Sequence, residues 1–209
     1  MARLAIATGN DHKVEEILAI LTPLVDGLTR RDIVTMRDID IDEPVENGVT
    51  FGDNATIKAR HLARATGLPT IADDSGLCVE VMGGAPGIFS ARWCGRHGDD
   101  QANLDLLLAQ LTDVPDEHRG AHFTCSVALV VPTGDGDTVT VVSGDMHGRL
   151  LTAPRGEGGF GYDPIFVADG YAVSNAELTP QDKNAISHRA QALQRIAPRI
   201  AEVLTVSRC

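Results

Sequence analysis

Residues 69–82 read PTIADDSGLCVEVM, in which two apolar runs flank a pair of acidic residues. The first run, residues 69–72, predicts a short strand that enters a turn at Asp73 and Asp74, and residues 77–82 predict the next strand. Polar residues at the end of a strand are where α/β proteins carry their sites. Because neighbouring side chains in an extended chain point opposite ways, we expect the two acids to have different roles. An Asx turn, in which the acids only cap the local backbone, is the alternative.

Helical and strand patterns alternate on both sides of this stretch. Further strands are expected at residues 4–7, 33–36, 123–131 and 138–143, and helices from residue 11 to Pro23, from about 53 to 65, at 99–111 and at 184–206, the last broken or kinked at Pro198. This alternation, with a central β-pair, predicts an α/β fold built on a mixed sheet. A length of 209 residues fits one ordinary domain, or two small lobes that share a cleft.

The charge of the chain disfavours several classes of function. Eighteen Lys and Arg residues against 29 Asp and Glu residues give a formal net charge of −11. A chain this acidic is a poor partner for a nucleic-acid polymer or an anionic membrane, so a phosphate would need a local site and a divalent metal. The apolar runs fall short of the roughly 20 residues of a membrane span, and the first is too short for a signal peptide. We therefore expect a globular, cytoplasmic protein.

Three familiar patterns occur in contexts that argue against them. The His and Cys pairs within residues 94–97 and 122–125 have ligand-like spacing but make a weak zinc site, so buried thiols are the expected alternative. Residues 156–161 match a dinucleotide fingerprint as text, but a strand-like segment follows them where a helix should open. Residues 38–42 carry three alternating aspartates, yet Glu43 stands where a calcium loop needs glycine.

Residues 8–13, Thr-Gly-Asn-Asp-His-Lys, join the first expected strand to the first expected helix. The free N–H groups and the dipole at a helix N-terminus favour an anion. Lys13 in the first turn opposes that dipole, which makes sense if a phosphate lies beside it. An ordinary strand-to-helix turn with a surface lysine is the alternative.

A second basic group lies near the C-terminus. Ser187, His188 and Arg189 begin a helical pattern, and Lys183 precedes them by one turn. These groups also run against the helix dipole and indicate a negative or electron-rich ligand. A solvated helix start, with Ser187 as its N-cap, is the alternative.

These and further segments form an ordered set, although each motif alone is weak. They are Thr8-Gly9-Asn10 with Lys13, Glu46-x-Gly48-x-Thr50-Phe51, Asn54-Ala55 with Lys58-Ala59, residues 72–77, 83–87, 90–92 and 158–164, Glu177-Leu178, Lys183 and residues 187–189. From residue 3 to about 200 the chain resembles the inosine triphosphate pyrophosphatase family of house-cleaning nucleotide hydrolases. It departs from the family at Asp53, where Glu is usual and whose role stays open, and at Trp93, where Tyr is commoner.

The resemblance implies an elongated mixed sheet flanked by helices. It implies one nucleotide pyrophosphatase domain over residues 1–209, with two lobes around a central active-site cleft, and a homodimer. It also implies Mg²⁺-dependent hydrolysis of ITP, dITP and XTP to the monophosphate and pyrophosphate. Such a reaction keeps deaminated purines out of nucleic acids.

The resemblance also assigns roles to the matching residues. Asp74 accepts a proton, and Glu46 and Asp74 hold the metal. The substrate-binding residues are Thr8, Asn10, Lys13 and Ser75 for the phosphates, Phe160 stacking on the base, Asp163, Lys183, His188 and Arg189 for the rest of the nucleotide, and Gly9, Asp11, His12, Gly161 and Tyr162 within the same segments.

The chemistry of these residues fits that reaction independently. Attack on a phosphorus surrounded by negative oxygens needs cations, which Lys13 and Mg²⁺ supply. A carboxylate beside a metal suits removal of a proton from water. Arg189 offers a planar fork of donors for the O6 atom of a purine, so we expect it to favour ITP over ATP.

Three rival functions stay open. The chain could prefer another altered nucleotide, cleave a different phosphate bond, or bind nucleotides as a regulator without hydrolysis. The presence of Asp74, Glu46 and Lys13 argues against the regulator.

Overall fold

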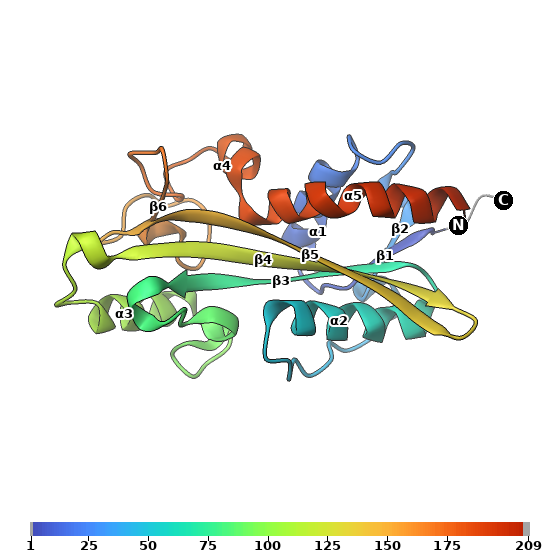
Figure 1. The fold of residues 1–209 in the computed structure, drawn as a ribbon, viewed down its shortest axis with the longest axis horizontal. Helices are drawn as coiled ribbons and strands as arrows, with labels where there is room; N and C mark the ends of the chain where they lie inside the picture. Colours follow the sequence, from blue (N-terminus) through green and yellow to red (C-terminus); the bar gives the residue numbers. More distant parts are fainter. Residues whose placement is uncertain (1, 207–209) are drawn as a thin grey trace. The chain divides into compact units, whose positions relative to one another are not determined.

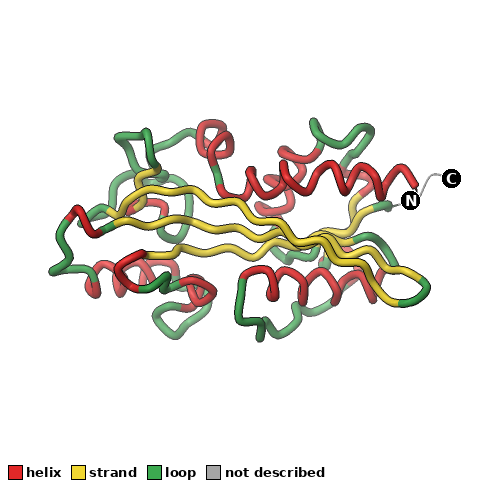
Figure 2. Tube along the Cα trace, in the orientation of Figure 1, coloured by secondary structure: helices red, strands yellow, loops and turns green. Residues whose placement is uncertain are grey.

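The computed structural model describes residues 2–206, except for the side chains of residues 11, 12 and 206. Its strands form a six-stranded sheet in the order β2-β1-β3-β4-β5-β6, with helices packed on its faces (Figures 1 and 2). The strands are β1 (Leu4–Ile6), β2 (Ile33–Thr35), β3 (Thr70–Val79), β4 (Gly120–Thr133), β5 (Gly136–Leu150) and β6 (Phe166–Ala168), and the α-helices are α1 (Asp11–Leu21), α2 (Phe51–Thr66), α3 (Asp100–Gln110), α4 (Pro180–Ile186) and α5 (His188–Val206).

The sheet is mixed, as the sequence predicts. Strand β1 pairs in parallel with β2 and β3, whereas β5 and β6 are antiparallel. The α/β fold class is therefore confirmed. None of the described helices is both long and apolar enough to span a bilayer.

Contacts divide the described chain into two compact units. Unit 1 takes the residues up to Asp74, residues 125–144 and the residues from Arg189 onward, and unit 2 takes residues 75–124 and 145–188. The long strands β3, β4 and β5 each contribute residues to both units.

Unit 1 has helices on both faces of its part of the sheet (Figure 1), and a buried core lies between each helical layer and the sheet. Leu4 and Ile6 of β1 pack with α1 and α5, whereas Ala5 and Ala7 pack with α2. Strand β4 repeats this pattern, because its odd-numbered residues 125–129 face α1 and α5 while Ala128 faces α2. The period of two that defines a strand thus sorts the chain between two helical layers.

Unit 2 has its own core, in which leucines of α3 pack against residues of β3 to β6. The Phe123 and Phe166 rings meet edge to face, with centroids 4.8 Å apart. Arg119 is 2% exposed. Its guanidinium donates to the carbonyls of Val114 (3.0 Å), Leu151 (3.1 Å) and Leu111 (2.6 Å). This buried cation therefore satisfies two carbonyls that follow the end of α3 and one that follows the end of β5.

The structure corrects two of the predicted boundaries. The prediction of a turn at Asp73 and Asp74 was wrong, because β3 runs unbroken from Thr70 to Val79 and carries both acids inside the strand. The strand lies between β1 and β4, so pairing on both sides outweighs the local turn tendency of the acids.

The C-terminal helical segment also differs from its prediction. It divides at Ser187, which has extended dihedral angles (φ −64°, ψ 147°), into α4 and α5. The helix is not broken at Pro198, which lies inside α5. Its neighbours Ala197 and Ile200 are buried in the core of unit 1, and this packing maintains the helix despite the missing N–H group.

The N-terminus of α2 has a capping box, which gives Asp53 the role that the sequence left open. The Thr50 hydroxyl accepts from the Asp53 N–H at 3.1 Å, and the Asp53 carboxylate accepts from the Thr50 N–H at 3.1 Å. Two of the otherwise unsatisfied N–H groups of the helix start are thereby bonded.

We expect Thr50→Ala to destabilise the protein by about 1 kcal/mol, since an N-cap hydroxyl is lost. The measurement is the free energy of unfolding from urea denaturation. Replacing the exposed loop residue Asp26 by Ser is the control, with an expected change within about 0.5 kcal/mol. Equal effects of the two substitutions would contradict the capping role.

Candidate functional site

The carboxylate of Asp74 is held against helix α2. The Asn54 side-chain amide donates to Asp74 Oδ2 at 3.1 Å, and Lys58 Nζ donates to Oδ1 at 3.3 Å. Asn54 and Lys58 lie one turn apart and so share a face of α2. The Gly48 N–H donates to Asn54 Oδ1 at 2.9 Å, which leaves the amide nitrogen to face Asp74. The orientation of this carboxylate is therefore fixed from both of its oxygens.

Gly48 has a steric reason to be glycine. A Cβ atom there would lie 2.5 Å from the Asp53 Cβ atom and 2.7 Å from Asn54 Oδ1. The close approach that orients Asn54 therefore requires a residue without a side chain. The Glu-x-Gly spacing noted in the sequence has this physical basis.

Charge around Asp74 adjusts its proton affinity. Burial and the nearby Glu46 carboxylate raise the pKa of Asp74 above its usual range, against the opposing effects of Lys58 and Asn54. Burial alone would lower the pKa of Lys58, but the Asp74, Asp73 and Glu46 carboxylates outweigh it and raise that pKa. Asp74 is thus a better proton acceptor than an ordinary aspartate, and Lys58 stays charged beside it.

Two carboxylates converge on one cationic atom in this cluster. Lys58 Nζ lies 3.0 Å from Glu46 Oε1 and 3.3 Å from Asp74 Oδ1. Carboxylate oxygens are hard donors, and Mg²⁺ is commonly bound by one or two of them together with substrate phosphates and water. The donor set fits Mg²⁺. Groups of three or more His, Cys, Asp or Glu with metal-binding placement were not found among the described residues.

Asp73 points to the opposite face of β3, toward α1 and α5. Its Oδ2 lies 3.3 Å from Lys13 Nζ and 3.1 Å from both Nε and Nη2 of Arg189. Arg189 Nη1 donates to Glu16 Oε2 at 2.8 Å. Burial would raise the pKa of Asp73, but Lys13, Arg189 and Lys58 outweigh it and hold that pKa below its usual range. The expectation that the two side chains point opposite ways is confirmed by their different partners, and their different roles stay a prediction.

The expected phosphate segment forms the entry to α1. Thr8 Oγ1 accepts from the Asn10 N–H at 3.1 Å, and Asn10 Oδ1 accepts from the Lys13 N–H at 3.4 Å. The Gly9 N–H donates to Glu43 Oε1 at 3.0 Å, so this N–H already binds an anionic oxygen. The side chains of Asp11 and His12, also predicted here, lie outside the described part of the chain.

A second group of predicted residues meets in unit 2. Lys183 Nζ forms an ion pair with Asp163 and lies 5.1 Å from the centroid of the Phe160 ring. Asp163 also accepts from the Phe160 N–H at 2.9 Å and from the Asn175 amide at 3.3 Å. The Phe160 ring is 60% exposed. A large exposed aromatic ring beside a fixed cation can stack on a planar ligand.

Two of the remaining predicted residues of unit 2, Tyr162 and His188, are buried. Tyr162 donates to the Ser90 carbonyl at 2.9 Å, and burial raises the pKa of its hydroxyl. The His188 ring stacks on Phe123, with centroids 5.1 Å apart and an interplanar angle of 13°. The Tyr162 side chain therefore packs in the core of unit 2, and its contact with substrate stays a prediction. The Gly161 N–H donates to Asp100 at 3.1 Å, and Ser75 is half-buried in β3.

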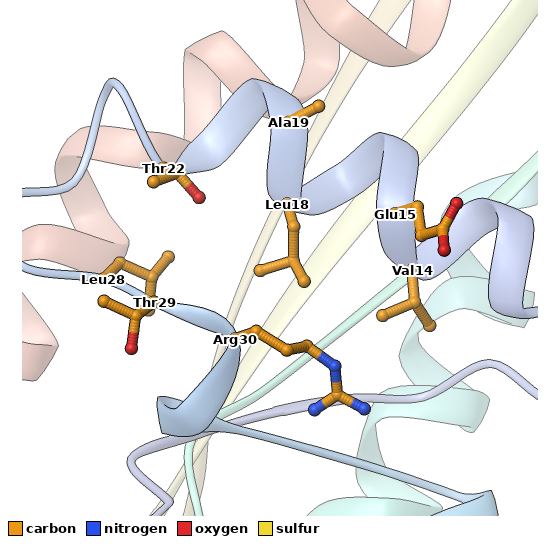
Figure 3. A pocket seen from close by; sticks show the side chains of 8 residues that line it. All are labelled: Val14, Glu15, Leu18, Ala19, Thr22, Leu28, Thr29 and Arg30. Carbon is orange, nitrogen blue, oxygen red and sulfur yellow. The ribbon is translucent and has the colours of Figure 1, made fainter.

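Helix α1 also borders a groove, which is lined by apolar residues as well as polar ones. It has a volume of about 620 Å³. Figure 3 shows Val14 and Leu18 pointing from the helix toward the Arg30 side chain. Lys13 and Glu16 project from α1 toward Asp73 and Arg189 instead. The groove is lined by Val14, Glu15, Leu18, Ala19, Thr22, Leu28, Thr29 and Arg30.

Sequence reasoning gave no role to four residues that the structure brings into these clusters. The sequence could have indicated Asn54 and Lys58, because polar residues one turn apart on an otherwise apolar helix face need buried partners. Glu16 lies one turn after Lys13, but its partner Arg189 is 173 residues away. Neither this long-range ion pair nor the contact of Glu43 with Gly9 produces a local pattern in the amino-acid sequence.

We expect Lys58→Met to raise the pKa of Asp74 further, because a cation that lowers it is removed while burial remains. The measurement is an NMR titration of the Asp74 carboxyl group in the metal-free protein. Arg60→Met, which removes an exposed partner of Asp137, is the control and should leave this pKa unchanged. A lowered or unchanged Asp74 pKa in Lys58→Met would contradict the charge assignment.

Comparison with known proteins confirms the resemblance drawn from the sequence. A model of the Ham1 family matches residues 4–199. A Streptomyces coelicolor protein named dITP/XTP pyrophosphatase is 55% identical over 204 residues, which cover 98% of this chain and 100% of that protein. A Nocardia farcinica protein of the same name is 52% identical over 202 residues, covering 96% of each.

Solved structures agree with this assignment. A nucleoside-triphosphatase / dITP/XTP pyrophosphatase from Mycobacterium abscessus is 46% identical, with a TM-score of 0.76 over 94% of this chain and 99% of that one. A HAM1 protein from Coxiella burnetii is 37% identical, with a TM-score of 0.84 over 97% of this chain and 100% of that one. The chain belongs to the Ham1 family.

Proposed function

We propose that the protein hydrolyses the non-standard purine nucleoside triphosphates ITP, dITP and XTP to the monophosphate and pyrophosphate. The observation that carries this proposal is the Asp74 carboxylate, which Asn54 and Lys58 orient and whose pKa is raised. It lies next to Asp73, which pairs with Lys13. The substrate class follows the names of the similar proteins. Both units belong to one catalytic domain in this proposal, since β3, β4 and β5 each run through both.

The residues of unit 1 supply binding and proton transfer. Glu46 and Asp74 would hold Mg²⁺, which when bound neutralises charge on the phosphate oxygens. Lys13 and the N–H groups at the start of α1 bind the triphosphate. Asp74 removes a proton from the attacking water while the water oxygen forms a bond to the α-phosphorus. The bond from that phosphorus to the bridging oxygen breaks, and pyrophosphate leaves.

Unit 2 supplies groups that suit a 6-keto purine. The exposed Phe160 ring stacks on the base, and Lys183, held by Asp163, donates to O6. Adenine has an amino group at C6 instead of O6, so this amino group and the Lys183 ammonium group, both donors, would face each other away from water. Such a mismatch costs about 1–3 kcal/mol for each buried group.

The assembly and location of the protein also belong to this proposal. We expect a homodimer on the basis of the family resemblance, and a cytoplasmic location because the apolar runs are too short for a membrane span or a signal peptide. Light scattering on the purified protein measures the oligomeric state.

With Mg²⁺ present, we expect the protein to convert ITP to IMP and pyrophosphate, and EDTA to abolish the reaction. Chromatography of the products, with XTP, dITP, ATP and GTP in parallel, is the measurement. IDP and orthophosphate as products would overturn the assignment to the α-phosphorus. Nucleotide binding without any product would indicate a regulator instead.

We expect Asp74→Asn to lower kcat with ITP at least ~100-fold, since a proton acceptor is lost at nearly constant volume. Asp137→Asn removes a carboxylate from an exposed ion pair in the same unit and is the matched control. Its kcat should equal that of the wild type. Similar losses in both variants would refute a catalytic role for Asp74.

A further inference from the structure

We propose that Asp100, in the first turn of α3, is a positioning residue for Phe160, the ring that stacks on the purine base in the proposed function. Asp100 holds the backbone beside this ring and does not itself contact the nucleotide. The inference rests on the proposed function, because it takes the stacking role of Phe160 from there. All the residues that carry it belong to unit 2.

Phe160 lies in the glycine-rich stretch noted in the sequence, between two glycines in the left-handed region. The φ angles are +71° at Gly159 and +60° at Gly161. A Cβ atom on Gly159 would collide with the Asp163 carboxylate, so that position requires glycine. Glycine has no side chain to pack and moves easily between positive and negative φ. Hydrogen bonds therefore have to hold the backbone of Phe160, whose ring is exposed.

The peptide groups on both sides of the Phe160 Cα atom are hydrogen-bonded. The Phe160 N–H donates to Asp163 Oδ2 at 2.9 Å, and the Phe160 carbonyl accepts from the Asp163 N–H at 3.2 Å. The next N–H, that of Gly161, donates to Asp100 Oδ2 at 3.1 Å. Asp163 belongs to the same turn as Phe160, whereas Asp100 is 61 residues from Gly161 in sequence. Asp100 therefore ties this turn to another element of unit 2.

The neighbouring acid, Asp99, already caps helix α3. Asp99 Oδ1 accepts from the Ala102 N–H at 3.1 Å, and Asp99 Oδ2 accepts from the Arg96 guanidinium at 2.7 Å. Asp100 instead reaches across to the turn that contains Phe160. A charged acceptor forms a stronger hydrogen bond with an N–H group than a neutral one does. The two acids at this helix start thus have different tasks, one local and one long-range.

The contact has its effect on recognition of the base. A ring whose backbone is held loses less conformational freedom when a base stacks on it, so the nucleotide binds more tightly. Lys13, Glu46 and Asp74, the groups for phosphate, metal and proton transfer in the proposed function, lie in unit 1. Loss of the Asp100 contact should therefore weaken nucleotide binding and leave the chemical step unchanged.

The first test separates KM from kcat in the hydrolysis of ITP with Mg²⁺. We expect Asp100→Ala to raise KM at least about fivefold, somewhat less than the roughly tenfold that a hydrogen bond to a charged group is worth. The value of kcat should stay within about twofold of the wild type. Asp105→Ala removes an exposed carboxylate from the same helix and is the matched control, with both constants unchanged.

Two further variants guard against a purely structural effect. The asparagine oxygen in Asp100→Asn can still accept from the Gly161 N–H, but the charge that favours the helix start is gone. We expect the KM of Asp100→Asn to stay within about twofold of the wild type. In a Phe160→Ala background, Asp100→Ala should raise KM less than about twofold, because its effect passes through the ring.

A measurement without substrate tests the contact itself. Hydrogen exchange of the Gly161 amide, followed by NMR in the free protein, should be at least about fivefold faster in Asp100→Ala than in the wild type. Asp105→Ala should leave this exchange rate unchanged.

Each contrary outcome has a distinct meaning. Unchanged Gly161 exchange in Asp100→Ala would overturn the inference, and so would an equal rise in KM with and without the Phe160 ring. Equally raised KM values in Asp100→Asn and Asp100→Ala would assign the effect to helix charge and would also overturn it. A wild-type protein that does not hydrolyse ITP would refute the proposed function, and the exchange of Gly161 would still decide whether Asp100 holds this turn.

Discussion

Two consecutive carboxylates inside a buried strand must each be neutralised, and in β3 they point to opposite faces of the sheet. Burying an unpaired charge costs several kcal/mol, of order the whole margin of stability of a domain. Asp73 is therefore matched by Lys13 and Arg189, and Asp74 by Lys58. Lys13 of α1, Lys58 of α2 and Arg189 at the start of α5 meet this requirement.

The need to neutralise both acids also gives the neighbouring residues Asp73 and Asp74 different charge environments. On the α2 face, Lys58 is outnumbered by two carboxylates, which leaves Asp74 with a raised pKa and able to accept a proton. On the other face, Asp73 is outnumbered by cations and keeps its charge. One carboxylate has a raised pKa and accepts a proton more readily, while its neighbour stays charged and anchors two cations. Alternation along a strand provides this division without any extra loop or domain.

Local patterns in the sequence were enough for much of the fold and for part of the site. The helix of residues 11–21 and the strand at Leu4 follow from apolar spacing, and the Asp73–Asp74 alternation follows from extended geometry. The strand through those acids was missed because pairing with β1 and β4 is a long-range effect. The partners of Arg189 were missed for the same reason, since a carboxylate 173 residues away leaves no periodic signal.

The bond between the Gly9 N–H and Glu43 has a consequence for selectivity among anions. An anion that binds to this N–H has to displace the Glu43 carboxylate, because two negative charges at one donor repel each other. A ligand with several phosphate groups can offset that cost through further contacts at the start of α1, whereas a small monoanion has only the one contact. The Glu43 contact therefore favours ligands with several phosphate groups.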